Sequence, residues 1–97
     1  MISAGGFSQQ TLAVFGLARS GLSAARALMA GGARVLAWDD VPARRDAAAA
    51  AGITLADPDG LDWRAVAALV LSPGVPLTHP APHPVVARAR AAGVEVI

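Results

Sequence analysis

The sequence has 97 residues, of which 55% are hydrophobic and 15% are charged, and its formal net charge is +1. This composition indicates one small globular domain and excludes a disordered chain. The absence of cysteine excludes disulfides and thiolate metal sites. No apolar run approaches the ~20 residues that span a membrane, and the first residues do not resemble a signal peptide. We therefore expect a cytoplasmic protein without membrane contact.

All the positively charged side chains are arginines, and the chain contains no lysine. The arginines are scattered along the sequence, so no basic stripe of the kind that binds nucleic acid is expected. An ATP-binding P-loop needs a Gly-Lys-Ser/Thr motif, whose ammonium group reaches the β- and γ-phosphates. The missing lysine therefore excludes an ATP site of that kind from this chain.

Strand-like runs alternate with helix-like runs along the whole chain. The expected strands are residues 11–15, 34–38, 53–55, 68–71 and 94–97. The expected helices are residues 20–30, 43–51, a segment that begins at Trp63, and 85–92. Asp40 is a candidate N-cap of the second helix and Asp62 of the third, because short acids accept hydrogen bonds from first-turn amides.

This alternation predicts βαβ units and therefore a parallel sheet. Right-handed crossovers then place helices on both faces of the sheet. The simplest arrangement is an α/β, Rossmann-like doubly wound sheet of five parallel strands in the order 3-2-1-4-5. In such a sheet the turn after the first strand lies at the switch point, where ligands commonly bind.

That turn reads G-L-A-R-S-G and begins at Gly16. Gly16 permits a tight turn, Gly21 lets the helix pack closely on the sheet, and Ala18 stands where dinucleotide-binding turns usually carry a second glycine. The amides of Arg19 and Ser20, together with the Ser20 hydroxyl, are candidate donors to a phosphate at the helix amino terminus. One or two such bonds correspond to about 4 kcal/mol, a millimolar affinity. The alternative is that the glycines serve only strand–helix packing.

An acid follows the second expected strand at the spacing of a nucleotide site. Asp39 lies 23 residues after Gly16, about where a ribose-binding acid belongs. Its carboxylate could accept from ribose hydroxyls or from an N–H on a base edge. The alternative is that Asp39 and Asp40 only cap the following helix.

A Ser-Pro-Gly segment leaves the fourth expected strand, opposite the glycine turn. Ser72 and Gly74 would then face the turn across the crevice, and a glycine there leaves room for a sugar or a phosphate; the alternative is a plain turn. His79 and His83 have the spacing of helical metal ligands, but the prolines between them exclude that helix. We therefore expect no metal site and assign His83 to a loop or a helix cap.

Several segments together resemble one enzyme family. They are VFGLARSGLSAARAL, RVLAWDD, LVLSPGVPLTHP and the final AAGVEVI. They are similar to the amino-terminal domain of the UDP-N-acetylmuramoyl-L-alanine:D-glutamate ligase family, over residues 11–97. The most specific of these motifs is SPGVPLTHP, and the glycine turn is the least specific.

The resemblance implies that residues 1–97 are the amino-terminal, UDP-substrate-binding domain of a three-domain, cytoplasmic ligase of peptidoglycan synthesis. In this family the first domain holds the uridine diphosphate part of UDP-N-acetylmuramoyl-L-alanine and uses no nicotinamide. The central domain carries a P-loop with ATP and Mg²⁺ and forms an acyl phosphate, which the amine of D-glutamate attacks. The resemblance therefore implies a chain without catalytic residues, metal or cofactor of its own, inactive alone and monomeric.

The family's functional residues map onto matching positions of this chain. By resemblance, Arg19 and Ser20 lie near the diphosphate, Asp39 contacts the uracil, and Gly74 lines the uridine pocket. Family members often carry Thr or Arg directly after the acid of the second strand, where this chain has Asp40 and Val41. The extra acid would repel a diphosphate at that edge.

The predicted UDP site consists of eight residues from three segments. They are Gly16, Ala18, Arg19, Ser20, Asp39, Asp40, Ser72 and Gly74. Ala18 is compatible with this reading because a UDP-sugar would approach the turn at another angle than a dinucleotide. The alternatives are a nicotinamide-dinucleotide-binding domain of an oxidoreductase and a regulatory nucleotide-sensing module.

Overall fold

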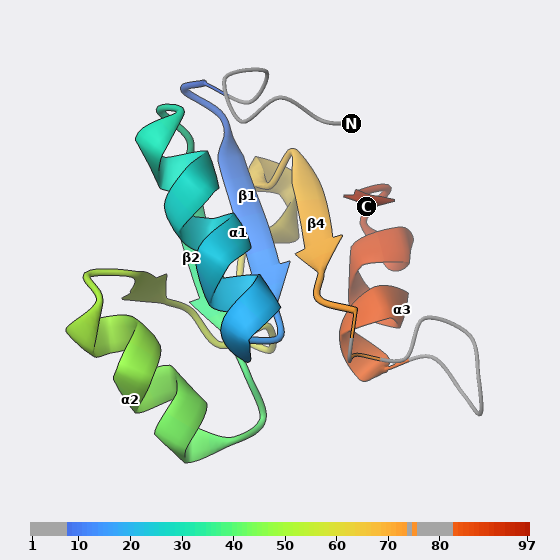
Figure 1. The fold of residues 1–97 in the computed structure, drawn as a ribbon. Coiled ribbons are helices and arrows are strands. Elements are labelled where there is room, and N and C mark those ends of the chain that lie inside the picture. Colours follow the sequence, from blue (N-terminus) through green and yellow to red (C-terminus); the bar gives the residue numbers. More distant parts are fainter. Residues whose placement is uncertain (1–7, 74, 76–82) are drawn as a thin grey trace.

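The computed structural model describes residues 8–73, 75 and 83–97. A parallel sheet with the order β3-β2-β1-β4-β5 forms the centre of the described structure (Figure 1). Its strands are β1 (Thr11–Phe15), β2 (Arg34–Trp38), β3 (Thr54–Leu55), β4 (Ala68–Leu71) and β5 (Glu95–Val96). The predicted five-stranded, doubly wound sheet and its strand order are confirmed.

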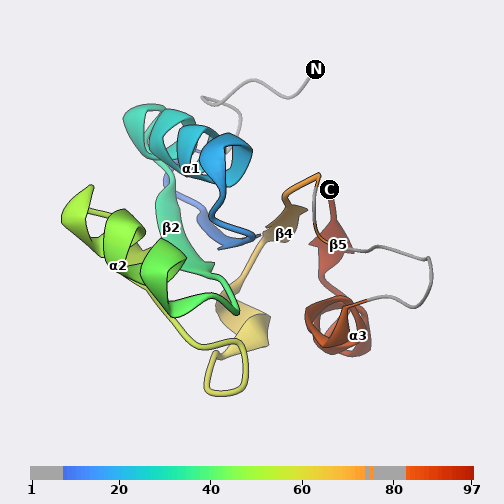
Figure 2. The same ribbon diagram turned by 60° about the horizontal axis from the view of Figure 1, so that its bottom comes forward.

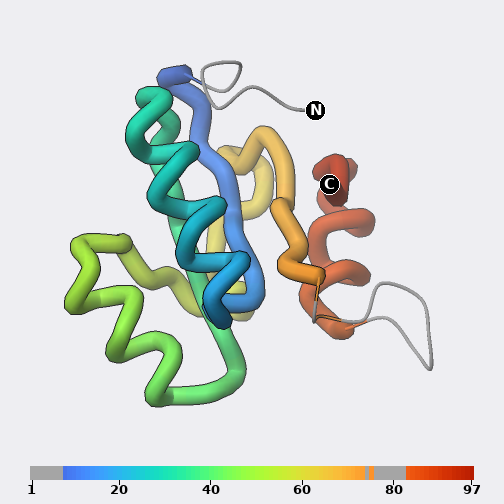
Figure 3. Tube along the Cα trace, viewed as in Figure 1, coloured from blue at the N-terminus to red at the C-terminus, as the bar shows by residue number. Residues whose placement is uncertain are grey.

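Helices cover both faces of this sheet, also as predicted. They are α1 (Arg19–Ala30), α2 (Pro42–Ala50), the short 3₁₀ helix η2 (Trp63–Ala65) and α3 (Pro84–Ala91). Figure 2 shows α1 on one side of the strands and α3 on the other. The tube in Figure 3 follows the chain through β1, α1, β2, α2 and β3 before it returns to β4 on the far side of β1.

The alternation of side chains along β1 divides the core into two layers. Leu12 and Val14 pack with the buried residues of α1 and α2, whereas Ala13 and Phe15 pack with those of α3. Consecutive residues of a strand point to opposite faces, so one short apolar strand supplies both layers. The glycine turn that follows β1 therefore leaves the central strand of the sheet.

Most helix ends agree with the sequence analysis, with one exception. Asp62 caps the helix at Trp63 as predicted, because its side chain accepts from the amide of Arg64, although that helix is a single 3₁₀ turn. The prediction that Asp40 caps α2 is wrong: the N-cap is Val41, without a side-chain cap. The carboxylate of Asp39 accepts from the Val41 amide instead, at 2.7 Å.

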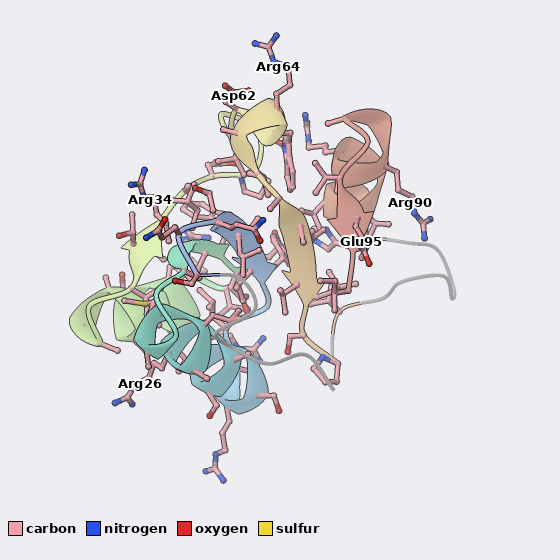
Figure 4. The ribbon with its side chains drawn as sticks, turned by 90° about the horizontal axis from the view of Figure 1, so that it is seen from above. Arg26, Arg34, Asp62, Arg64, Arg90 and Glu95 are labelled. Atoms are coloured by element: carbon pink, nitrogen blue, oxygen red, sulfur yellow. The ribbon has the colours of Figure 1, made fainter. Side chains whose placement is uncertain are left out.

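The arginines are spread over the surface. Figure 4 shows four of them pointing away from the sheet in different directions: Arg26, Arg34, Arg64 and Arg90. Within the described ranges, no helix combines the length and the apolar character that a membrane crossing requires. The same part of the chain holds no group of three or more His, Asp or Glu side chains that could ligate a metal ion.

Candidate functional site

The glycine turn between β1 and α1 is held by close backbone contacts. Gly16 has φ +98°, a conformation that favours glycine, and its amide donates to the carbonyl of Trp38 at 3.0 Å. A Cβ at Gly16 would lie 2.5 Å from Cβ of Ser72, and one at Gly21 would lie 1.7 Å from the carbonyl oxygen of Gly16. Packing alone therefore requires both glycines, so their presence is not by itself evidence for a ligand.

The amino terminus of α1 is open. Ala18 is the N-cap, in an extended conformation, and offers no side-chain oxygen; the first turn contains no acid. The amide of Leu22 donates to the carbonyl of Ala18, so the amides of the three residues before Leu22 have no acceptor within the helix. These amides and the helix dipole favour an anion at this end of α1.

Asp39 connects this turn to the segment after β2. The residue is 4% exposed, and its carboxylate accepts from the amide of Leu17 and from that of Val41, each at 2.7 Å. Burial raises the pKa of Asp39, but these two amides and the nearby charge of Arg44 outweigh it and hold the pKa below its ordinary value. Asp39 is therefore an ionised structural group at the junction of two loops.

Arg44 is a residue of this site that the sequence analysis missed. It lies in the first turn of α2, with its side chain half exposed and Nη1 at 3.6 Å from Oδ2 of Asp39. From the sequence, Arg19 was the only arginine assigned to the site, and Arg44 was counted among the surface arginines. The spacing from Asp39 to Arg44 carries no signal, because the direction of α2 relative to the turn sets this contact.

These features border one cavity of about 360 Å³, which we call the turn cleft. It is lined by Gly16, Ala18, Arg19, Ser20, Asp39, Arg44, Ser72, Pro73 and Val75. The structure thus brings six of the eight predicted site residues together, from three segments of the chain. Gly74 lies outside the described residues, and Asp40 does not line this cleft.

Asp40 faces a second cavity of about 670 Å³, on the α3 side of the sheet, which we call the aromatic cavity. It is lined by Phe15, Trp38, Asp40, Arg45, Asp57, Pro58, Asp59, His83, Pro84, Val85 and Arg88. Arg88 lies 2.8 Å from Asp59 here, whereas the Arg45 guanidinium lies 4.5 Å from the centroid of the Trp38 ring and donates to the backbone carbonyl of Asp39 at 2.9 Å.

His83 joins Asp40 to α3 across this cavity. Its Nδ1 accepts a hydrogen bond from the amide of Val85, which confirms the predicted capping role. Its ring packs against the Phe15 ring, with the two ring centroids 4.4 Å apart. Because Nδ1 is an acceptor, a neutral ring carries its proton on Nε2, which then donates to the Asp40 carboxylate at 2.7 Å. Asp40 therefore serves a contact between loops that are 43 residues apart.

Comparison with known proteins identifies close relatives of the whole chain. It is 63% identical over 97 residues to a UDP-N-acetylmuramoylalanine–D-glutamate ligase from Phenylobacterium zucineum, and 57% identical to one from Mesorhizobium japonicum. The resemblance to this ligase family is confirmed. Each alignment covers 100% of this chain and 21% of the relative, so this chain spans about a fifth of the length of these relatives. No model of a protein family matches it.

Solved structures share the fold of this chain. Shikimate dehydrogenase from Aquifex aeolicus matches with a TM-score of 0.67 at 16% identity, over 93% of this chain and 42% of the dehydrogenase. The A chain of dipicolinate synthase from Bacillus subtilis matches with a TM-score of 0.67 at 18% identity, over 94% of this chain and 37% of the synthase. At such low identity these matches support the Rossmann-like fold alone.

Proposed function

We propose that this chain is the UDP-substrate-binding domain of a UDP-N-acetylmuramoylalanine–D-glutamate ligase and that the turn cleft holds the diphosphate. The observation that carries the proposal is the open amino terminus of α1 at a cleft lined by Arg19 and Ser20, in a chain 63% identical to part of such a ligase. The substrate named for the relatives contains a diphosphate, the kind of group that a helix amino terminus binds.

The chemistry of the cleft favours binding over catalysis. Backbone amides, an arginine and a hydroxyl can orient a phosphate by charge-assisted hydrogen bonds. A general base would need a free oxygen placed for proton transfer, but both oxygens of Asp39 already accept amide hydrogen bonds, and its lowered pKa makes it a weak base. The cleft therefore fixes one end of the substrate and leaves the reacting carboxyl group to other parts of the enzyme.

ATP and Mg²⁺ do not fit the residues of this chain. There is no lysine to complete a P-loop, and the described residues contain no cluster of carboxylates around a common point. We propose that ATP, Mg²⁺ and D-glutamate bind outside these 97 residues and that the chain alone forms no amide bond. A cytoplasmic location and a monomeric state remain predictions from the sequence.

Calorimetric titration of the 97-residue chain tests the proposal. UDP and UDP-N-acetylmuramoyl-L-alanine should bind with dissociation constants of roughly millimolar or below. NAD should not bind in the same range, because the methyl group of Ala18 stands where a dinucleotide turn brings backbone and phosphate closest. Binding of NAD without binding of UDP would overturn the proposal in favour of an oxidoreductase domain.

A further inference from the structure

Two arginines line the turn cleft, and they come from different helices. Arg19 opens α1, and Arg44 lies in the first turn of α2. Figure 1 shows that both helices begin at the edge of the sheet to which the arrows of β1 and β2 point. Arg64 and Arg88 have partners elsewhere, Asp62 and Asp59, and Arg45 donates to the backbone carbonyl of Asp39 but lines the aromatic cavity.

The contact between Arg44 and Asp39 leaves most of the guanidinium available. The separation of 3.6 Å is longer than a hydrogen bond, and half of the Arg44 side chain is exposed. Asp39 already receives two shorter hydrogen bonds from backbone amides. A guanidinium has five N–H donors in a planar fork that matches two phosphate oxygens, so one weak ion pair does not exhaust it.

The charge of the cleft also requires this arginine. The ionised carboxylate of Asp39 would repel a diphosphate, and Arg44 is the cation beside it. Because the positive charge of Arg44 offsets the negative charge of Asp39, the charge of Arg19 and the amides of α1 give the cleft a net attraction for the ligand. Without Arg44, one cation would face one anion in the cleft.

We infer that Arg44 is a second diphosphate-binding residue, which reaches the ligand from α2 while the amides of α1 hold it from the other side. This inference rests on the proposed function, and it specifies that the cleft clamps the diphosphate between two helices. It also assigns the binding energy of Arg44 to the phosphates and none to the uracil or the ribose.

Titrations of matched variants with UDP, inorganic pyrophosphate and uridine test the inference. Arg44→Ala should weaken the binding of UDP and of pyrophosphate about 10-fold, because a charge-assisted bidentate pair is lost. The binding of uridine, which has no phosphate, should not change. Arg44→Lys should lose less affinity than Arg44→Ala, because lysine keeps the positive charge although it lacks the planar fork of donors. Arg26→Ala is the control. The Arg26 side chain is exposed on α1 and points away from the sheet (Figure 4), so this variant removes the same charge from outside the cleft.

The outcomes separate the two proposals. If the unchanged chain binds UDP and Arg44→Ala binds it as Arg26→Ala does, the inference about Arg44 fails and the proposed function stands. If Arg44→Ala weakens uridine as much as UDP, Arg44 acts through the fold of the cleft and the inference also fails. If the unchanged chain binds neither UDP nor pyrophosphate, both proposals fail.

Discussion

The turn cleft and the aromatic cavity, both at the carboxyl edge of the sheet, differ in character. The tips of β1 and β2 separate them: Phe15 and Trp38 face the aromatic cavity, whereas the next residues, Gly16 and Asp39, face the turn cleft. The aromatic cavity is larger, at about 670 Å³ against about 360 Å³. In it Asp40 contacts His83 and Asp59 contacts Arg88, while the smaller cleft has the open end of α1. The proposed UDP site is therefore the cavity with available donors and not the larger one.

The comparison also separates two uses of an acid after β2. Asp39 is buried and accepts from two backbone amides, and Asp40 is exposed and binds a histidine of α3. Neighbouring residues at a strand end point to opposite faces, so consecutive acids serve opposite cavities. The following variants test this division, from the largest expected effect to the smallest.

Gly21→Ala should have the largest effect, because the added methyl group prevents the close approach of Gly21 to Gly16 in the turn. The new methyl group would lie 1.7 Å from a backbone oxygen that cannot rotate away. We expect a loss of more than about 3 kcal/mol in the free energy of unfolding, measured by urea denaturation. Gly52→Ala is the control: Gly52 has φ +83° but nothing within 4 Å of its Cβ, so it should cost about 1 kcal/mol. Equal losses for both variants would contradict the packing account.

Asp39→Asn should lower the free energy of unfolding by about 2 kcal/mol, because a single amide oxygen replaces two charged acceptors and the new NH₂ group faces a backbone donor. Because the folded pKa of Asp39 lies below its ordinary value of 3.8, its contribution is complete above that pH and is lost as the pH falls through the folded pKa. Urea midpoints measured between pH 2 and 7 should therefore show a smaller acid-induced loss in the variant. Parallel curves for the two proteins would show that Asp39 is not the group responsible.

The fold was predictable from the sequence, and part of the site was not. Apolar runs, punctuating glycines and the alternation of element types determine strand order, and the turn G-L-A-R-S-G places Arg19 and Ser20 directly. The contact of Asp40 with His83 was not predictable, because 43 residues separate the partners and the docking of α3 decides it. Arg44 was missed for the same reason, since the orientation of α2 brings it to the cleft.

Ala18→Asp should separate stability from binding. The extended N-cap conformation suits a carboxylate that accepts from the first amides of α1, so stability should rise by about 0.5–1 kcal/mol. The same carboxylate would occupy the donors proposed for the diphosphate, so UDP affinity measured by calorimetry should fall about 10-fold or more. Ala18→Gly, which adds no acceptor, should keep the affinity. A more stable Ala18→Asp variant with unchanged UDP binding would refute the role of these amides.

His83→Ala should affect stability alone and leave the turn cleft intact. It removes the N-cap of α3 and the bond to Asp40, so we expect a loss of about 1 kcal/mol in thermal or urea unfolding. UDP binding should stay unchanged, because His83 lines the aromatic cavity and not the turn cleft. A UDP affinity that falls several-fold in a folded His83→Ala variant would mean that the ligand extends into the aromatic cavity.

Residue-by-residue NMR titration with UDP tests the central claim most directly, because it locates the ligand in one of the two cavities. The account predicts the largest ¹H–¹⁵N shift changes at the amides of Arg19, Ser20 and Gly21, with little change at Val85 of α3. Changes centred on Val85 and the indole N–H of Trp38, with the α1 amides unmoved, would place the ligand in the aromatic cavity and contradict the account.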